Sequence, residues 1–291
     1  MLKINQKWLL LIILSIIWGS SFILIKKSLI GLTPIQLGAL RIIISGLILF
    51  AAGFGRLKNL SKTTLKWIVV SGFLGTFVPA FLFAYAITEI DSAVASILNS
   101  LVPLNTIIIG FIVFQIFSSR KQIIGVIIGL FGTTLLIGSG ATINPDQNYW
   151  FTLLVIIATI NYALSVNIIK RHLQDVPALT IAVGNFVAII IPAIIVLIYD
   201  GFFTSEVIQS PNLKPALFYL LILSIFGTVL AKIMFNKLVQ ISTPVFASSV
   251  TYLMPVIAVM WGVLDGESFS VWQALATGFI LWGVYLANYN K

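Results

Sequence analysis

Residues 225–239 read IFGTVLAKIMFNKLV, a mainly apolar run in which a lysine, Lys232, lies well inside with no acidic residue beside it. With the apolar residues before it, the run forms a segment, 215–238, that is long enough to cross a bilayer, for which about 20 mainly apolar residues suffice. A charge held in the hydrocarbon core costs on the order of 3 kcal/mol even on the lenient insertion scale. The segment therefore predicts a membrane helix, and its lysine needs an explanation.

The whole chain has the composition of a membrane protein. Of its 291 residues, 59% are hydrophobic and 9% are charged, and the mean hydropathy is +1.11. Soluble domains carry roughly 25% charged residues, so we expect lipid to surround most of the chain. The net charge of +9 is more typical of cytoplasmic loops in a membrane protein than of nucleic-acid binding. The chain has no cysteine, which excludes disulfides and thiol chemistry.

The hydropathy pattern predicts an all-α integral membrane protein with ten transmembrane helices. The links between the apolar segments are short and rich in polar residues, glycine and proline, which leaves no room for a soluble domain. The first segment is expected to be a retained helix rather than a cleaved signal peptide, because two lysines follow it. The expected spans are 8–26, 34–54, 65–87, 92–116, 122–139, 149–169, 178–199, 215–238, 244–264 and 271–289.

Loop charge predicts the orientation of these spans. With ten spans both termini lie on one side, and an excess of Lys and Arg marks that side as cytoplasmic. We therefore expect a multi-pass protein of the cell inner (plasma) membrane with both termini in the cytoplasm. The cytoplasmic side would hold Lys3, Lys7, Arg56, Lys58, Lys62, Lys66, Arg120, Lys121, Lys170, Arg171, Lys237 and Lys291, and the other side Lys26, Lys27 and Lys214.

The two halves of the sequence resemble each other. A shift of 152 residues places Gly75-Thr76 on Gly227-Thr228 and Leu101-x-Pro103 on Leu253-x-Pro255, and a shift of 144 places Trp18 on Tyr162. We expect a first repeat over 1–140 and a second over 141–291, each of five helices. Because five is odd, the repeats would be inverted in the membrane, an arrangement common in secondary transporters with a substrate site between the halves.

Six short motifs occur in order along the chain: WGSSF (18–22), LRI (40–42), GTVLA (227–231), TPVFAS (243–248), MPV (254–256) and GE (266–267). In these motifs the chain resembles the EamA-type members of the drug/metabolite transporter superfamily, over essentially its whole length. The resemblance implies ten helices around a central cavity, and export or exchange of small polar metabolites such as amino acids. Two positions depart from the family pattern, Gln115 where the second repeat has Glu267, and Met254 before Pro255.

Lys232 is the leading candidate for a substrate-binding residue. Ser224, Thr228, Lys232 and Asn236 recur every four residues and so share one helix face. Such a face suits a cavity better than lipid, and the ammonium would attract an anionic group of the substrate. The alternatives are a structural pair, or snorkelling of the long side chain to the membrane interface.

Other polar and aromatic side chains in the spans are weaker candidates. Arg41 could bind substrate, form a gate or reach the interface. Small polar residues more often mediate helix packing than bind ligands, and some aromatic residues will be core or interface anchors. Besides Lys232, Thr228, Asn236 and Arg41, the candidate binding residues are Trp18, Ser21, Tyr85, Asn99, Asn161, Tyr162, Thr251 and Tyr252, and the candidate hinge or bend residues are Pro79, Pro103 and Pro255.

Several function classes lack their usual signature. The sequence has no P-loop for ATP, no cluster of His and carboxylates for a metal and no nucleophile–base set, so we expect no cofactor and no enzyme. We expect a secondary-active or facilitative transporter of a small polar metabolite, working by alternating access. A channel, an intramembrane enzyme and a non-transporting receptor remain as alternatives.

Overall fold

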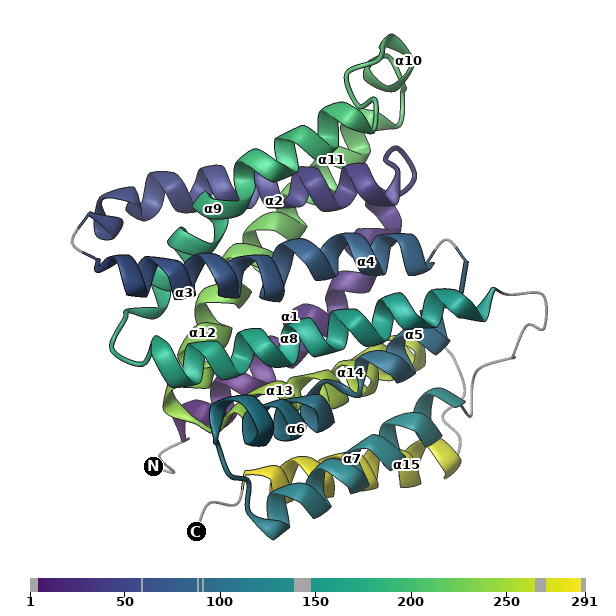
Figure 1. Ribbon diagram of the computed structural model, residues 1–291. Helices are drawn as coiled ribbons and strands as arrows, with labels where there is room; N and C mark the ends of the chain where they lie inside the picture. Colours follow the sequence, from purple (N-terminus) through teal and green to yellow (C-terminus); the bar gives the residue numbers. More distant parts are fainter. Residues whose placement is uncertain are drawn as a thin grey trace.

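The computed structural model describes residues 5–58, 60–87, 89–90, 92–138, 148–264 and 271–288, and the regular elements in these ranges are helices (Figure 1). Seven of the described helices are long and apolar enough to cross a membrane, and three shorter apolar helices cover 6–21, 244–257 and 271–287. Each of these helices overlaps one of the ten predicted segments, and seven of them have the length of a span. The predicted fold class, a helical membrane protein, is thus confirmed. Residues 139, 266, 267 and 289 of the predicted spans and motifs lie outside the described residues.

The first half of the chain has breaks inside two of its predicted spans. Segment 65–87 contains a π-helical turn, and segment 92–116 is interrupted near Leu101. The elements are α1 (Gln6–Ser28), α2 (Pro34–Gly53), η1 (Phe54–Leu57), α3 (Lys62–Gly72), η2 (Phe73–Phe77), α4 (Val78–Ile87), α5 (Ser92–Asn99), α6 (Val102–Phe114) and α7 (Arg120–Gly138).

The second half shows corresponding breaks. Segment 215–238 contains a longer π-helical stretch, and segment 244–264 is interrupted at Ser249. The elements are η3 (Tyr149–Phe151), α8 (Thr152–His172), α9 (Ala178–Tyr199), α10 (Ser205–Ile208), α11 (Leu213–Ile222), η4 (Leu223–Leu230), α12 (Ala231–Ile241), α13 (Pro244–Ser248), α14 (Val250–Leu264) and α15 (Val271–Ala287).

Helix starts follow from capping residues. Thr33 and Gln36 form a capping box at the start of α2, with Pro34 in the first turn. Thr243 accepts a hydrogen bond from the Phe246 amide at the start of α13, where Pro244 again occupies the first turn. Such side chains satisfy the amides that a helix start leaves without a partner, and proline fits there because it has no amide hydrogen to lose.

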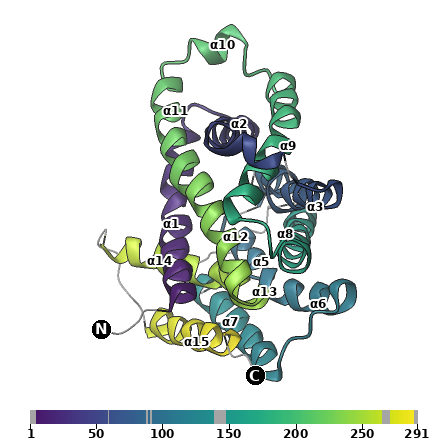
Figure 2. The ribbon, with the colours of Figure 1, turned by 90° about the vertical axis from the view of Figure 1, so that its left-hand side faces the viewer.

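Helices of the two halves pack against each other in matched pairs (Figure 2). Helix α2 packs on α9 and α7 packs on α15, while α1 packs on α14 and α8 on α6. When the ten predicted segments are numbered along the chain, the second pairs with the seventh and the fifth with the tenth. The first pairs with the ninth and the sixth with the fourth, so corresponding segments of the two halves make corresponding contacts. Helix α12 lies among α1, α8 and α9 in the middle of the bundle.

The contacts also define how the paired helices run. Gly46 faces Ile190 and Gly53 faces Val183, so α2 and α9 are antiparallel. Helices α7 and α15 are antiparallel as well, since Gly125 meets the backbone of Ala287 and Gly132 that of Ile280. Their glycines let the two backbones approach closely. Helix α1 begins and α15 ends at the same end of the bundle, on the left of Figure 1.

Candidate functional site

Two glycine carbonyls in the bundle centre lack the backbone donor that an α-helix would supply. The Gly75 oxygen would accept from the amide of residue 79, but residue 79 is proline, which has no amide hydrogen. The Gly227 oxygen would accept from Ala231, but the π-helical register of η4 turns that amide to the Phe226 oxygen. Since π-helical turns often mark functional sites, these carbonyls are a natural place to look for one.

The Gly227 carbonyl is bound by side chains from the first half of the chain. Arg41 of α2 donates from Nη2 to this oxygen at 3.2 Å and from Nε to Thr228 Oγ1 at 2.6 Å. The Trp18 indole of α1 donates to the same carbonyl at 2.9 Å. Both hydrogen-bond partners of the guanidinium among the described residues are neutral oxygens, so its charge has no matching carboxylate there.

The Gly75 carbonyl is bound by a side chain from the second half. Lys232 of α12 donates from Nζ to this oxygen at 3.1 Å, and the lysine is 9% exposed. Ser165 of α8 lies beside it and donates to the Ser71 carbonyl at 2.9 Å. Lys232 therefore points into the bundle and does not snorkel to the interface.

The two cations converge on one helix face. Thr228, which binds Arg41, lies one turn before Lys232, a rise of about 6 Å, and Asn236 follows one turn later. All three are buried, together with Ser224, as the four-residue spacing predicts. None of α1, α2, η2, α8, η4 and α12 contains an Asp or Glu. The centre is therefore positively charged, and an anionic group would be attracted to it.

Aromatic rings lie next to this pair of cations. Trp18 packs on Phe235 with ring centroids 5.4 Å apart. Tyr162 of α8 packs near Phe83 at 6.2 Å, and its phenol is close enough to Arg41 to interact electrostatically. Flat rings beside buried donors suit a small organic molecule with one polar end, because apolar contacts enclose it while a few polar groups orient it.

Comparison with known proteins decides the family. The family model described as "EamA-like transporter family" matches residues 6–138 and again 149–289. The chain belongs to the EamA-like transporter family.

Relatives of this EamA-like chain are named as membrane transporters. It is 26% identical over 285 residues to an uncharacterized inner membrane transporter, YedA, of Escherichia coli K12, covering 96% of this chain and 89% of the relative. It is 24% identical over 288 residues to an S-adenosylmethionine/S-adenosylhomocysteine transporter of Chlamydia muridarum, covering 94% and 89%. One solved crystal structure shares the fold, with a TM-score of 0.76 and 20% identity over 97% of this chain and 96% of that one. Family and relatives point to a membrane transporter and not to an enzyme.

The structure brings several predicted site residues of this EamA-like transporter together and leaves others apart. Ser21 joins the cluster, because a Cβ on Gly227 would lie 2.9 Å from its Oγ. Tyr252 faces the scaffold instead, donating to the Val126 carbonyl of α7 at 3.0 Å. Tyr85 is 51% exposed. The side chains of Asn161 and Thr251 donate to backbone carbonyls about one turn earlier in the sequence. Asn99 is half-buried in α5.

The predicted bend residues occupy three different settings. Pro79 follows η2 and deprives Gly75 of its donor, Pro103 lies in the first turn of α6 next to the break after α5, and Pro255 lies inside α14. All three are predicted hinge or bend residues. Only the setting of Pro79 places a proline against a carbonyl that a cation binds.

Ser165 is not among the predicted site residues. This residue lies against Gly75 as Ser21 lies against Gly227, so a Cβ on either glycine would press on a serine oxygen. The signal was present, because the shift of 144 residues that pairs Trp18 with Tyr162 also pairs Ser21 with Ser165. Ser45, which donates to the Ser224 carbonyl at 3.3 Å, was missed as well.

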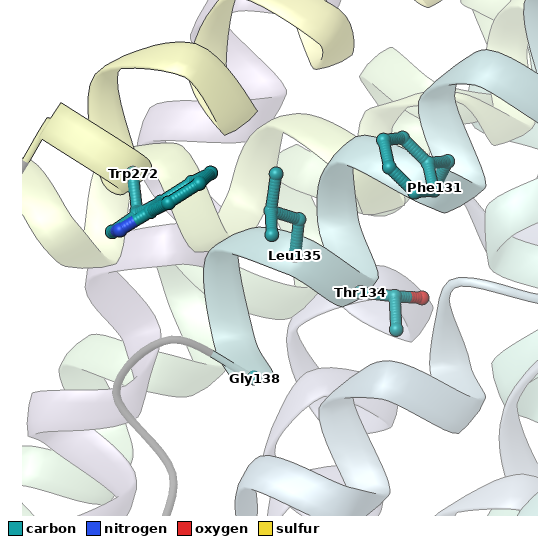
Figure 3. A pocket seen from close by; sticks show the side chains of 5 residues that line it. All are labelled: Phe131, Thr134, Leu135, Gly138 and Trp272. Carbon is teal, nitrogen blue, oxygen red and sulfur yellow. The ribbon is translucent and has the colours of Figure 1, made fainter.

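A groove of about 480 Å³ lies on the helix pair α7 and α15 (Figure 3). In Figure 1 this pair is at the bottom of the bundle, whereas α2, which carries Arg41, is near the top. The lining of the groove is almost entirely apolar, and the one hydroxyl, on Thr134, donates to its own helix at Leu130. A polar metabolite would find no charged side chain among the residues that line it. We therefore place the candidate site at the cation pair and not in this groove, which is lined by Phe131, Thr134, Leu135, Gly138 and Trp272.

Proposed function

We propose that this protein is a secondary-active or facilitative transporter of a small polar metabolite that carries a carboxylate, such as an amino acid. Cargo would be exported or exchanged by alternating access, with the two halves moving about the central cation pair. The observation that carries the proposal is Lys232, a buried cation whose hydrogen-bond partner in the described part of the chain is a neutral carbonyl 3.1 Å away.

Two inverted five-helix repeats, within 1–140 and 141–291, are the architecture that this mechanism needs. The separate matches of the family model to 6–138 and 149–289 support them. The antiparallel pairing of α2 with α9 and of α7 with α15 supports the inversion, because helices that an in-plane two-fold axis exchanges must run in opposite directions. On this basis the three shorter apolar helices also cross the bilayer, which gives ten spans.

Loop charge supports an orientation with both termini in the cytoplasm. The basic residues near the described span ends gather on the side where α1 begins and α15 ends, among them Arg56, Lys66 and Arg171. Because the excess of Lys and Arg sets topology, we assign that side to the cytoplasm of the cell. Lys232 then lies within the cytoplasmic half of its span.

A carboxylate suits Lys232 because of electrostatics. A cation removed from water without an opposite charge is costly, and a carbonyl oxygen compensates for it only in part. Charge-assisted hydrogen bonds are roughly twice as strong as neutral ones. A cargo carboxylate would therefore gain binding energy at Lys232 that an uncharged analogue could not.

S-adenosyl compounds are a second candidate cargo. The Chlamydia muridarum relative is named as a transporter of S-adenosylmethionine and S-adenosylhomocysteine. These molecules combine an amino-acid carboxylate with a flat base, and the cations lie beside the rings of Trp18 and Tyr162. Stacking between rings adds to the binding of such a cargo.

Reconstitution in liposomes tests the proposal. Uptake and counterflow are measured for amino acids, S-adenosylhomocysteine, amines, nucleosides and sugar phosphates, and then for each transported carboxylate against its amide. We expect transport of at least one carboxylate, a preference for it over its amide, and loss of that preference in Lys232→Met. The matched control is Lys237→Met, because Lys237 is exposed on the same helix.

The outcomes separate the proposal from its alternatives. Normal carboxylate transport by Lys232→Met at unchanged KM would contradict the role of this lysine. Flux without saturation and without counterflow would identify a channel. Binding of a panel member without counterflow would identify a receptor.

A further inference from the structure

The contact between Lys232 and Gly75 involves a proline, Pro79, that has no role in the transport mechanism proposed above. An α-helix would satisfy the Gly75 carbonyl through the amide of residue 79, and Pro79 removes that amide. The carbonyl oxygen is then available to an outside donor, and Lys232 is the donor that reaches it, at 3.1 Å.

Helix stability alone does not explain a proline at position 79. Within a helix it costs about 3 kcal/mol relative to alanine, and Pro79 lies in the continuous span from α3 through η2 to α4. The other half reaches the same result differently, since η4 frees the Gly227 carbonyl through its π-helical register while residue 231 is alanine. Both halves thus present a glycine carbonyl to a cation of the opposite half.

The environment of Gly75 leaves space for no other side chain. A Cβ at this position would overlap Ser165 Oγ and would lie 3.2 Å from Lys232 Nζ. The lysine ammonium therefore lies directly against the backbone of η2, and Ser165 is anchored beside it on the Ser71 carbonyl. No carboxylate from the described residues competes for this ammonium.

We propose that Pro79 is a positioning residue, and that the Gly75 carbonyl it frees is a place-holder for a carboxylate oxygen of the cargo. Between transport events the carbonyl keeps Lys232 turned into the site. The cargo carboxylate replaces it, because a charge-assisted hydrogen bond is stronger than a neutral one. The inference rests on the proposed function for the identity of the cargo, but the hold of the carbonyl on Lys232 is testable without any cargo.

The test restores the missing amide. In Pro79→Ala, the new amide donates to Gly75 and competes with Lys232 for the oxygen. We expect acetic anhydride to modify Lys232 faster in full-length Pro79→Ala in nanodiscs, by about fivefold relative to Lys237, the effect of one lost hydrogen bond. Pro192→Ala is the matched control, because Pro192 also lies inside a helix, α9, and should leave the ratio unchanged.

A second measurement tests the inference even if Pro79→Ala changes the overall structure. Hydrogen exchange at the backbone amide that Pro79→Ala introduces should be slow, because this amide is bonded to Gly75. Fast exchange at that new amide, or unchanged modification of Lys232 in the same variant, would overturn the inference. Neither result depends on cargo. Loss of carboxylate preference in Lys232→Met, together with unchanged labelling of Lys232 in Pro79→Ala, would refute the hold of the Gly75 carbonyl and leave the proposed function standing. Normal carboxylate transport by Lys232→Met would refute the role of Lys232 in cargo binding, whatever the labelling shows.

Discussion

The two π-helical segments, η2 and η4, differ in how firmly the opposite half holds them. The Gly227 carbonyl in η4 accepts from Arg41 and Trp18, and Arg41 has a second bond to the adjacent Thr228. The Gly75 carbonyl in η2 accepts from Lys232 alone among the described side chains. The hydroxyl of Thr76, the counterpart of Thr228, has no partner among the described residues. From this difference in hydrogen bonding we expect Arg41 to stay in place and Lys232 to be the cation that exchanges its partner.

The largest expected effect is a difference in melting temperature between variants that lack one or the other of the two cations. Arg41→Met removes two hydrogen bonds of a charged donor, each worth about 1.5–3 kcal/mol, and should lower the melting temperature of the purified protein. Lys232→Met removes a buried cation with one neutral partner and should leave the melting temperature unchanged or higher, because the cost of burying the charge disappears. Thermal unfolding in detergent measures both. An equal loss in the two variants would remove the distinction.

The next effect compares the glycines themselves. Gly75→Ala forces a methyl group onto Ser165 Oγ, whereas in Gly227→Ala the nearest atoms are Leu223 Cδ1 and Ser21 Oγ, both at 2.9 Å. Overpacking costs about 1–3 kcal/mol, and we expect transport in liposomes to fall by more in Gly75→Ala. Gly278→Ala is the control, since no atom lies within 4 Å of its added Cβ. A larger loss in Gly227→Ala would place the sensitive segment in the other half.

The smallest effect concerns the neutral donors. Trp18→Phe keeps a ring against Phe235 and removes the indole bond to Gly227, whereas Ser165→Ala removes the hydroxyl bond to Ser71. Each change should cost about 1 kcal/mol, or about fivefold in transport rate. Counterflow at saturating cargo measures the two losses. A loss of more than about tenfold for either variant would show that the neutral donor contributes more than one ordinary hydrogen bond.

The sequence predicts much of the fold because membrane helices leave a strong signal. Three features can be recognised in the sequence: the ten apolar segments, the offset of 152 residues and the polar face from Ser224 to Asn236. Lipid requires long apolar runs, and a lysine inside such a run is conspicuous. Pro79, four residues after Gly75, was also readable as a missing donor. Pro79 was predicted only as a bend residue.

Other parts of the site could not be predicted from the sequence. The π-helical register of η4 depends on packing against α1 and α2, and no residue in 223–230 requires it. The facing of Tyr252 toward α7 depends on Gly129, which would meet the tyrosine ring at 2.6 Å if it carried a Cβ. A tertiary contact of this kind, between residues far apart in the chain, has no periodic signature in either segment.

The most direct test of the central claim is a structure of the protein with a transported carboxylate bound. The account predicts that Lys232 Nζ lies within hydrogen-bond distance of a carboxylate oxygen and has left the Gly75 carbonyl, while Arg41 still binds Thr228 and Gly227. A structure in which Lys232 remains on Gly75 and the carboxylate lies elsewhere would contradict it.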